Sequence, residues 1–369
     1  RPPHRLEGVA QSVYITSAEG HSGKPTVALG VLDALSRATS RVGVFRAIAR
    51  STRERDYVLE MLLDHDGVDL PYEECVGVTY DDVREDPDAA LSTIVERYKA
   101  VEAQCDAVVI VGSDYTDVGS PAELAYNARI AANLGAPVLL VLGGRAAQGQ
   151  AEQLGATLPR TPAEMGQIAD LALAELVHGR AQLFAVIANR VEEDERDEVI
   201  AAVRRSLTSE RSLDAANVPV WAIPEDRFLV APSMRGILRA VDGELIAGDP
   251  ELLTREALGV VVAAMSMVNV LPRLLEGAVV VIPADRSEVL LAALLANASG
   301  TFPSISGIVL NGGFDLPEPV RRLIDGLGSN VPIISTELGT YDTAVRVMNT
   351  RGRLAADSQR RYDTALSLF

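Results

Sequence analysis

Residues 16–26, TSAEGHSGKPT, hold most of the pattern of a phosphate-binding loop. In that pattern, GxxxxGK followed by Ser or Thr, backbone N–H groups wrap the phosphates, the lysine reaches the terminal phosphates and the hydroxyl binds Mg²⁺. Gly23 and Lys24 fit the pattern, but Ala18 stands at its first glycine, where Gly20 could relieve the turn instead. The residues of this stretch that could contact an anion are Gly20, Ser22, Gly23, Lys24 and Thr26.

Pro25 occupies the position that needs Ser or Thr, and it changes the chemistry that this loop can do. Proline has neither the hydroxyl that would bind magnesium nor a backbone N–H that could donate to a phosphate. Thr26 offers a hydroxyl one residue later, but about 100° further around the helix. Because proline is tolerated in the first turn of a helix, we predict a retained fold without efficient ATP turnover. Binding of an anion or nucleotide effector at the helix N-terminus, and a working ATPase, are the alternatives.

Two further groups of polar residues follow predicted strands, at the sheet edge where ligands bind in α/β proteins. Asp114 and Asp117 come after the run AVVIV at 107–111, and a carboxylate there could bind a metal or only form a turn. Asn189 follows the run LFAVIA at 183–188 and could read a base or simply end the strand. None of the four histidines is paired with Cys or carboxylates at ligand spacing, so we predict no metal site.

The elements that must position these residues are short β-branched runs alternating with amphipathic stretches. This alternation predicts an α/β fold with a doubly wound, mostly parallel sheet of degenerate P-loop NTPase type. Since 48% of the residues are apolar but only 4% aromatic, the cores must consist of Val, Ile, Leu and Ala. With 369 residues and a pattern that restarts after residue 225, we expect two domains. The predicted parts are a flexible tail at 1–10, the P-loop-type domain at 11–225 and a smaller α/β domain at 226–369.

The net charge of −17 makes nucleic acids and anionic membrane surfaces poor partners. The longest apolar stretch, residues 257–268, is shorter than the roughly 20 residues of a membrane span. Two cysteines without paired spacing predict reduced thiols, and no charged-then-apolar signal segment follows Arg1. These features together predict a cytoplasmic protein that binds neither nucleic acid nor membrane.

Three stretches, in this order, resemble the long phosphate acetyltransferases of the actinobacterial type. They are SAEGHSGKPTVALGVLDAL, then VGVFRAIAR, and then PADRSEVLLAALLA followed by GIVLNGGF. The first two are similar to a dethiobiotin-synthetase-like domain, and the third resembles the domain named DRTGG. Asp285, Arg286, Asn311, Gly312 and Gly313 stand at the hallmark positions of DRTGG.

The resemblance implies a regulatory and assembly role for this chain. In the family, acetyl-CoA and phosphate are converted to acetyl phosphate and CoA by a separate C-terminal domain, which would begin where this chain stops. We therefore carry over no catalytic residue and expect no cofactor in this chain, with CoA and acetyl-CoA as substrates of the parent enzyme. Expected partners are the catalytic domain of the same protein, further copies in a homo-oligomer, and a metabolite or nucleotide effector such as NADH, pyruvate or phosphoenolpyruvate. The DRTGG domain is expected to dock on the first domain and pass on a signal.

Two departures from the family pattern bear on these expectations. Arg46-Ala47 replace a Lys-Pro pair, so a cation that could contact an anion is kept with a different shape, and Asn311 replaces the threonine of the DRTGG signature. Together with Pro25, Arg46 argues against dethiobiotin-type chemistry. The alternative functions are an ATP-dependent synthetase or amidotransferase of the dethiobiotin or cobyrinate kind, and a scaffold without a ligand.

Overall fold

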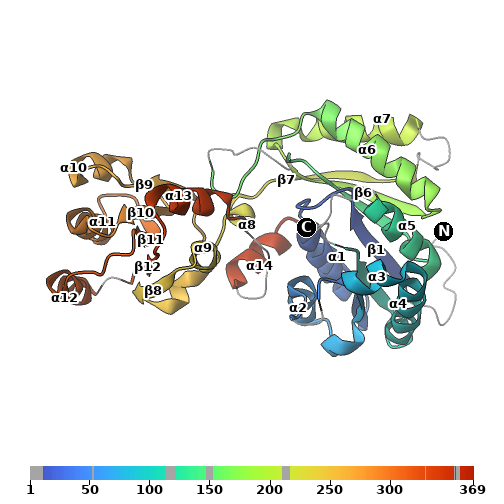
Figure 1. Ribbon diagram of the computed structural model, residues 1–369. Coiled ribbons are helices and arrows are strands. Elements are labelled where there is room, and N and C mark those ends of the chain that lie inside the picture. The colour runs from blue at the N-terminus through green and yellow to red at the C-terminus, as the bar shows by residue number, and fades with distance from the viewer. Residues whose placement is uncertain are drawn as a thin grey trace. The chain divides into compact units, whose positions relative to one another are not determined.

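The computed structural model describes residues 11–51, 54–113, 122–146, 153–209, 217–328, 330–352, 354 and 358–369. These residues form two compact units (Figure 1). The first unit comprises the described residues of Arg1–Ala147, Pro159–Glu225 and Leu354–Phe369. The second comprises those of Gln148–Leu158 and Asp226–Arg353. The predicted contiguous domains, 11–225 and 226–369, differ from this division because one internal and one C-terminal segment each belong to the other unit.

The first unit is built on a seven-stranded parallel sheet with the strand order β3-β2-β4-β1-β5-β6-β7. Its strands form because they are apolar runs buried on both faces, as a covered parallel sheet requires. The sheet places the ends of β1, β4, β2 and β6 at one edge. The strands are β1 (Gln11–Ser17), β2 (Val42–Ala49), β3 (Val76–Thr79), β4 (Ala107–Val111), β5 (Val138–Gly143), β6 (Leu183–Val191) and β7 (Val220–Pro224).

Helices cover this sheet, and several begin at a residue that caps the free N–H groups. Asp56 caps α2 and Asp86 caps α4, while Thr79 and Thr161 form capping boxes at α3 and α6. In Figure 1, α6 and α7 lie together over the β6 and β7 end of the sheet. The helices are α1 (Lys24–Ala38), α2 (Tyr57–Leu63), α3 (Tyr80–Glu85), α4 (Pro87–Glu102), α5 (Ala122–Leu134), α6 (Pro162–His178), α7 (Arg196–Ser209) and α14 (Gln359–Leu366).

Helix α14 returns from the end of the chain to pack on α1. The ring of Phe369 lies directly over Gly30, in the space that a side chain at residue 30 would need. Tyr362 lies beside His65, with 6.5 Å between the ring centroids, and the Nε2 of His65 is 3.5 Å from Asp33 on α1. The C-terminal segment is therefore part of the first unit's packing, which the sequence did not predict.

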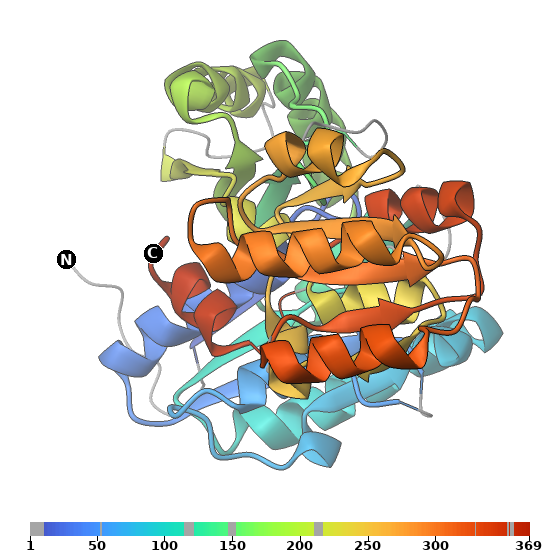
Figure 2. The same ribbon diagram turned by 90° about the vertical axis from the view of Figure 1, so that its left-hand side faces the viewer.

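The second unit has a five-stranded sheet in the order β8-β12-β11-β10-β9, in which only β8 is antiparallel. Figure 2 looks onto α11 and α12, which lie side by side on one face of this sheet. Its strands are β8 (Glu244–Ala247), β9 (Gly259–Val262), β10 (Ala278–Pro283), β11 (Ile305–Asn311) and β12 (Ile333–Ser335). Its helices are α8 (Arg227–Val230), α9 (Met234–Ala240), α10 (Met267–Val270), α11 (Ser287–Ser299), α12 (Glu318–Leu327) and α13 (Thr340–Asn349).

The predicted fold class, a mostly parallel doubly wound sheet followed by a smaller α/β unit, is confirmed. The edge strand β3, only four residues long, was not predicted. Both cysteines are buried free thiols, and burial raises the pKa of Cys75 to about 12. Among the described helices, none combines the length and the apolar character that crossing a bilayer would demand.

Candidate functional site

The loop between β1 and α1 makes a sharp turn into the helix. His21 and Gly23 have positive φ angles of 59° and 77°, so the chain turns sharply before α1 begins at Lys24. Pro25 occupies the start of the helix, where its missing N–H costs no intrahelical bond. The Thr26 N–H donates to the carbonyl of Gly23 at 3.0 Å, and its side chain is buried. A tight turn therefore precedes α1, and Pro25, which has no N–H, lies in the first turn of that helix.

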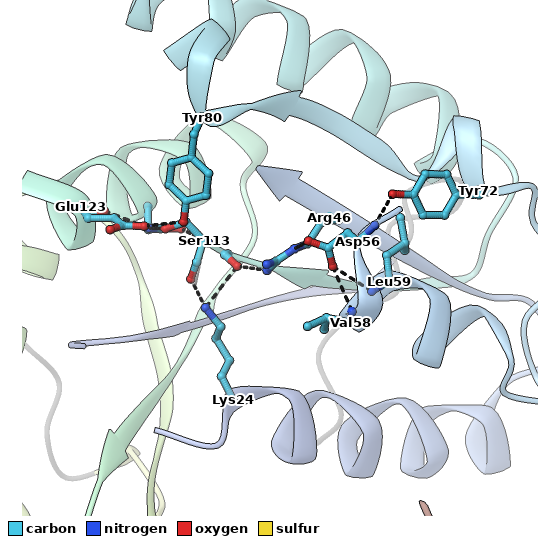
Figure 3. Close-up of polar contacts among 11 residues, drawn as sticks. Lys24, Arg46, Asp56, Val58, Leu59, Tyr72, Tyr80, Ser113 and Glu123 are labelled. Carbon is cyan, nitrogen blue, oxygen red and sulfur yellow. Dashed lines mark hydrogen bonds and ion pairs between the residues drawn. The ribbon is translucent and has the colours of Figure 1, made fainter. Parts of the chain in front are cut away.

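Lys24 points its ammonium group at backbone carbonyls of the protein (Figure 3). Its Nζ donates to the carbonyl of Gly112 at 3.2 Å and to that of Ser113, both just after β4, and the residue is only 3% exposed. In a working phosphate loop this lysine reaches the terminal phosphates of the nucleotide. Here its hydrogen bonds join the start of α1 to the end of β4.

Asn189 and Arg190, at the end of β6, hold the loop from the other side. The Nδ2 of Asn189 donates to the carbonyl of Ser22 at 2.9 Å, and an Nη of Arg190 donates to that of His21 at 2.7 Å. Glu225 in turn accepts a hydrogen bond of 2.8 Å from the Nε of Arg190. The sequence prediction placed Asn189 at this edge, and its amide is used to bind the loop backbone.

A carboxylate lies within the loop itself. Glu19 forms an ion pair with Arg160, whose Nη2 donates to the Glu19 Oε2 at 2.8 Å. Arg160 also donates to the carbonyl of Gly143 at the end of β5, at 2.7 Å. A phosphate in the loop would therefore approach a negative charge, and the arginine that could compensate is already bonded to that charge.

Arg46 lies within β2, which pairs with β4, and it is buried (Figure 3). Its Nε donates to the carboxylate of Asp56 at 3.1 Å, and an Nη donates to the carbonyl of Gly112. Asp56 also accepts from the N–H groups of Val58 and Leu59 at the start of α2. Lys24 and Arg46, both predicted as anion ligands, thus meet at the same carbonyl of Gly112.

A second polar network lies beside this carbonyl and was missed by the sequence reasoning. The Nδ2 of Asn127 donates to the hydroxyl of Ser113 at 2.7 Å, and the hydroxyl of Tyr14 donates to the Asn127 Oδ1 at 2.7 Å. Tyr80 donates to Glu123 at 2.9 Å nearby. Burial raises the pKa of Tyr14 far above its usual range. The sequence did contain a signal for this network, because Tyr14 and Asn127 are polar residues within otherwise apolar segments.

The other predicted residues fall into two groups. Gly20 is partly exposed and Ser22 is buried, both within the loop. Asp114 and Asp117 lie outside the residues that the structure describes. Across the described stretches, no group of three or more His, Cys, Asp or Glu side chains is arranged to hold a metal ion.

The DRTGG residues lie at the carboxyl ends of β10 and β11 in the second unit. Asn311 is buried and shares a hydrogen bond of 2.8 Å with the hydroxyl of Thr340 at the start of α13. Gly312 and Gly313 both have positive φ, at 101° and 69°, which explains why glycine is needed there. Arg286 donates to the carbonyl of Met265 at 3.2 Å. Asp285 is exposed. These residues tie neighbouring loops together.

Residues 11–223 match the family described as AAA domain. The chain belongs to this AAA domain family. Residues 236–350 of this AAA domain protein match the DRTGG domain. The chain is 31% identical over 371 residues to a phosphate acetyltransferase of Nitratidesulfovibrio vulgaris, and the alignment covers 98% of this chain and 50% of that protein. A phosphate acetyltransferase of Synechocystis sp. is 27% identical, with 98% of this chain and 50% of that protein covered. The predicted resemblance is confirmed, and the chain spans about half the length of these relatives.

Solved structures that match part of the chain include the MinD cell division protein of Aquifex aeolicus. It is 18% identical, with 60% of this chain and 84% of that chain covered and a TM-score of 0.33. The CBS and DRTGG domains of the regulatory region of Clostridium perfringens pyrophosphatase, complexed with the activator diadenosine tetraphosphate, are 17% identical. That match covers 40% of this chain and 57% of the other, with a TM-score of 0.28.

Proposed function

We propose that this chain is a regulatory and assembly region of a phosphate acetyltransferase and does not itself catalyse acetyl transfer. The parent reaction would convert acetyl-CoA and phosphate to acetyl phosphate and CoA. Support comes from relatives of that name, which align with this chain over about half their length, and from the DRTGG domain. The proposal includes a cytoplasmic location, a homo-oligomer and a catalytic domain elsewhere in the parent protein as the partner of this region.

One observation carries the assignment of the loop: the hydrogen bonds of Lys24 to the carbonyls of Gly112 and Ser113. To bind a nucleotide, the lysine would have to leave these acceptors. The carboxylate of Glu19 would oppose the phosphate, and Pro25 supplies neither a donor nor a magnesium ligand. We infer that the loop serves as a structural joint between β1, β4 and β6. An effector would then be a small metabolite or a nucleotide that does not depend on this lysine.

Calorimetry with Mg-ATP tests this assignment directly. We expect no binding heat for the natural chain and none for Lys24→Ala, whereas the melting temperature of Lys24→Ala should fall because the buried carbonyls of Gly112 and Ser113 lose their hydrogen bonds from Lys24. The control is Lys99→Ala, since Lys99 is an exposed lysine paired with Glu102 at 2.6 Å. Binding of Mg-ATP that Lys24→Ala abolishes and Lys99→Ala keeps would establish the synthetase alternative and end this proposal.

Two further measurements test the regulatory role. The chain alone should form no acetyl phosphate from acetyl-CoA and phosphate, and measurable turnover would contradict the division of labour. A thermal-shift screen against ATP, NADH, pyruvate and CoA should reveal an effector, because a ligand that binds only the native state raises the melting temperature by mass action. If no compound shifts the melting temperature, the effector part of the proposal fails and the scaffold alternative gains.

A further inference from the structure

Several exposed apolar side chains lie at the carboxyl edge of the second unit's sheet. Four parallel strands, β12, β11, β10 and β9, end there side by side. The segments that follow them, each a loop together with the first residues of the next helix, are 336–342, 312–318, 284–288 and 263–268, and all are described. The exposed apolar residues in these segments, which we call the edge patch, are Tyr341 (79%), Val268 (70%), Phe314 (57%), Met267 (44%) and Met265 (41%).

Hydrogen bonds from the backbone and from the Arg286 side chain join the four segments. The N–H of Gly312 donates to the carbonyl of Leu338 at 2.8 Å, which ties the loop after β11 to the loop after β12. The N–H of Ala284 donates to the carbonyl of Asn311 at 2.9 Å, and Arg286 donates to the carbonyl of Met265 at 3.2 Å. With neighbouring strands about 4.8 Å apart, the outer loops are roughly 14 Å from each other. The edge patch is therefore a fixed surface long enough to contact about two to three turns of a helix.

Two exposed aromatic rings at one edge are unusual in a chain with only 4% aromatic residues. The ring of Phe314 folds back over Gly312, whose missing side chain leaves room for it, and yet remains 57% exposed. Exposed apolar groups that gather on a rigid surface mark interaction sites, and methionines suit such sites because their side chains adapt to a partner's shape.

The charge around the edge patch is strongly negative. The four segments contain one cationic side chain, Arg286, whose Nε donates to Glu288 at 2.7 Å. That ion pair holds the pKa of Glu288 below its usual range. The carboxylates in these segments are Asp285, Glu288, Asp315, Glu318, Glu337 and Asp342. A partner that covers the apolar centre must bring positive charge to the rim, and another copy of a chain with a net charge of −17 is poorly suited to that.

We propose that the edge patch binds a basic amphipathic helix of another polypeptide. The apolar face of such a helix would cover Phe314, Tyr341 and the methionines, while its Lys and Arg side chains would reach the acidic rim. This is the helix-on-apolar-surface type of peptide recognition, with the charges setting specificity and association rate. The inference rests on the second unit alone and does not depend on the function proposed for the loop of the first unit.

The test uses the whole chain and two synthetic peptides of about 18 residues, with leucine at helical spacing and either lysine or glutamate at the other positions. Fluorescence anisotropy should detect binding of the Leu/Lys peptide and none of the Leu/Glu peptide. Phe314→Ser/Tyr341→Ser should weaken binding at least about tenfold, since buried aromatic residues dominate such interfaces. Neutralising the rim with Asp315→Asn/Asp342→Asn should also weaken it, and added salt should weaken it further.

The matched control is Phe184→Ser/Trp221→Ser. It removes two rings of the first unit that are 51% and 50% exposed, and it leaves the net charge unchanged. If the Leu/Lys peptide binds this control, the natural chain and Phe314→Ser/Tyr341→Ser with equal affinity, the attraction is to an acidic protein in general. That result would overturn the proposal. Absence of Leu/Lys binding would overturn it too. So would self-association of the chain that Phe314→Ser/Tyr341→Ser abolishes, because the occupant would then be a second copy.

Discussion

The guanidinium of Arg46 and the carboxylate of Asp56 form an ion pair at 3.1 Å in which each side chain is only 1% exposed. Arg46 lies in β2 and Asp56 is the N-cap of α2, so the pair fixes that helix to the sheet. The same guanidinium donates to the Gly112 carbonyl that Lys24 also uses. A residue that the sequence offered as an anion ligand is thus bonded to an internal carboxylate.

Arg46→Met should destabilise the chain by about 3–5 kcal/mol, because it leaves the Asp56 carboxylate buried without its cation. The free energy of unfolding in urea measures this loss. Adding Asp56→Asn, which removes the charge but keeps an oxygen for the α2 cap, should cost less in the Arg46→Met background than in the natural chain. Losses that simply add, or a single loss within about 0.5 kcal/mol of zero, would contradict the role of the pair.

Gly23 and Asn189 provide a second prediction. A Cβ at residue 23 would lie well inside 3.0 Å of the Asn189 amide, and the φ of Gly23 is 77°. Gly23→Ala therefore combines a steric clash with left-handed strain of about 1–2 kcal/mol. Gly135 is the matched control, since its φ is 66° and nothing lies within 4 Å of a Cβ there.

We expect Gly23→Ala to lower the urea midpoint more than Gly135→Ala does. In an Asn189→Ser background, which shortens the side chain in the way, the difference between the two substitutions should shrink. If Gly23→Ala and Gly135→Ala cost the same, Asn189 does not close on the loop as described.

The sequence predicted the sheet better than the use of its edge. Apolar runs determine which segments form β1, β4 and β6, and the Gly23-Lys24 pair determines that a tight turn follows β1. The partner of Lys24 is a backbone carbonyl 88 residues away, which no residue type encodes. Likewise the neutralisation of Arg46 depends on how α2 begins, at Asp56. The position of Lys24 and Arg46 near the sheet edge was predictable from the topology. The acceptors within the protein to which they donate are brought to them only by tertiary packing.

The return of α14 was missed for a related reason. Its sequence is polar apart from Tyr362, Ala365 and Leu366, so its local pattern does not reveal that it packs on α1. The buried contact depends on Gly30, which looks from the sequence like an ordinary weak point in a helix. The space above that glycine accommodates the ring of Phe369.

The effect of Gly30→Ala on stability should therefore depend on whether residue 369 is Phe or Ala. In the natural chain, the new methyl group would displace the Phe369 ring, so hydrogen exchange in α14 should accelerate. In a Phe369→Ala background the same substitution should stabilise the chain by up to about 1 kcal/mol, because alanine favours a helix over glycine. Hydrogen exchange of residues 359–366 and urea unfolding report the two effects. Gly30→Ala that leaves α14 exchange unchanged would refute the contact with Phe369.

Tyr362 makes the docking of α14 sensitive to alkaline pH. Burial, reinforced by Asp33 and the neighbouring carboxylates, raises the pKa of Tyr362 to about 12. Because an unfolded tyrosine titrates near a pKa of about 10, the unfolded chain loses this proton first as the pH rises. The contribution of Tyr362 to stability is therefore complete below about pH 10 and is lost as the pH rises towards about 12.

The free energy of unfolding should fall with pH in this range more steeply for the natural chain than for Tyr362→Phe, which has no hydroxyl to titrate. The buried tyrosines Tyr14 and Tyr98 also have a raised pKa and contribute a common slope to both chains. The control is Tyr341→Phe, because the Tyr341 ring is 79% exposed, and it should follow the natural chain. If Tyr362→Phe also follows the natural chain, the surroundings of Tyr362 do not raise the pKa of its hydroxyl, and α14 must be held by Phe369 and its other contacts.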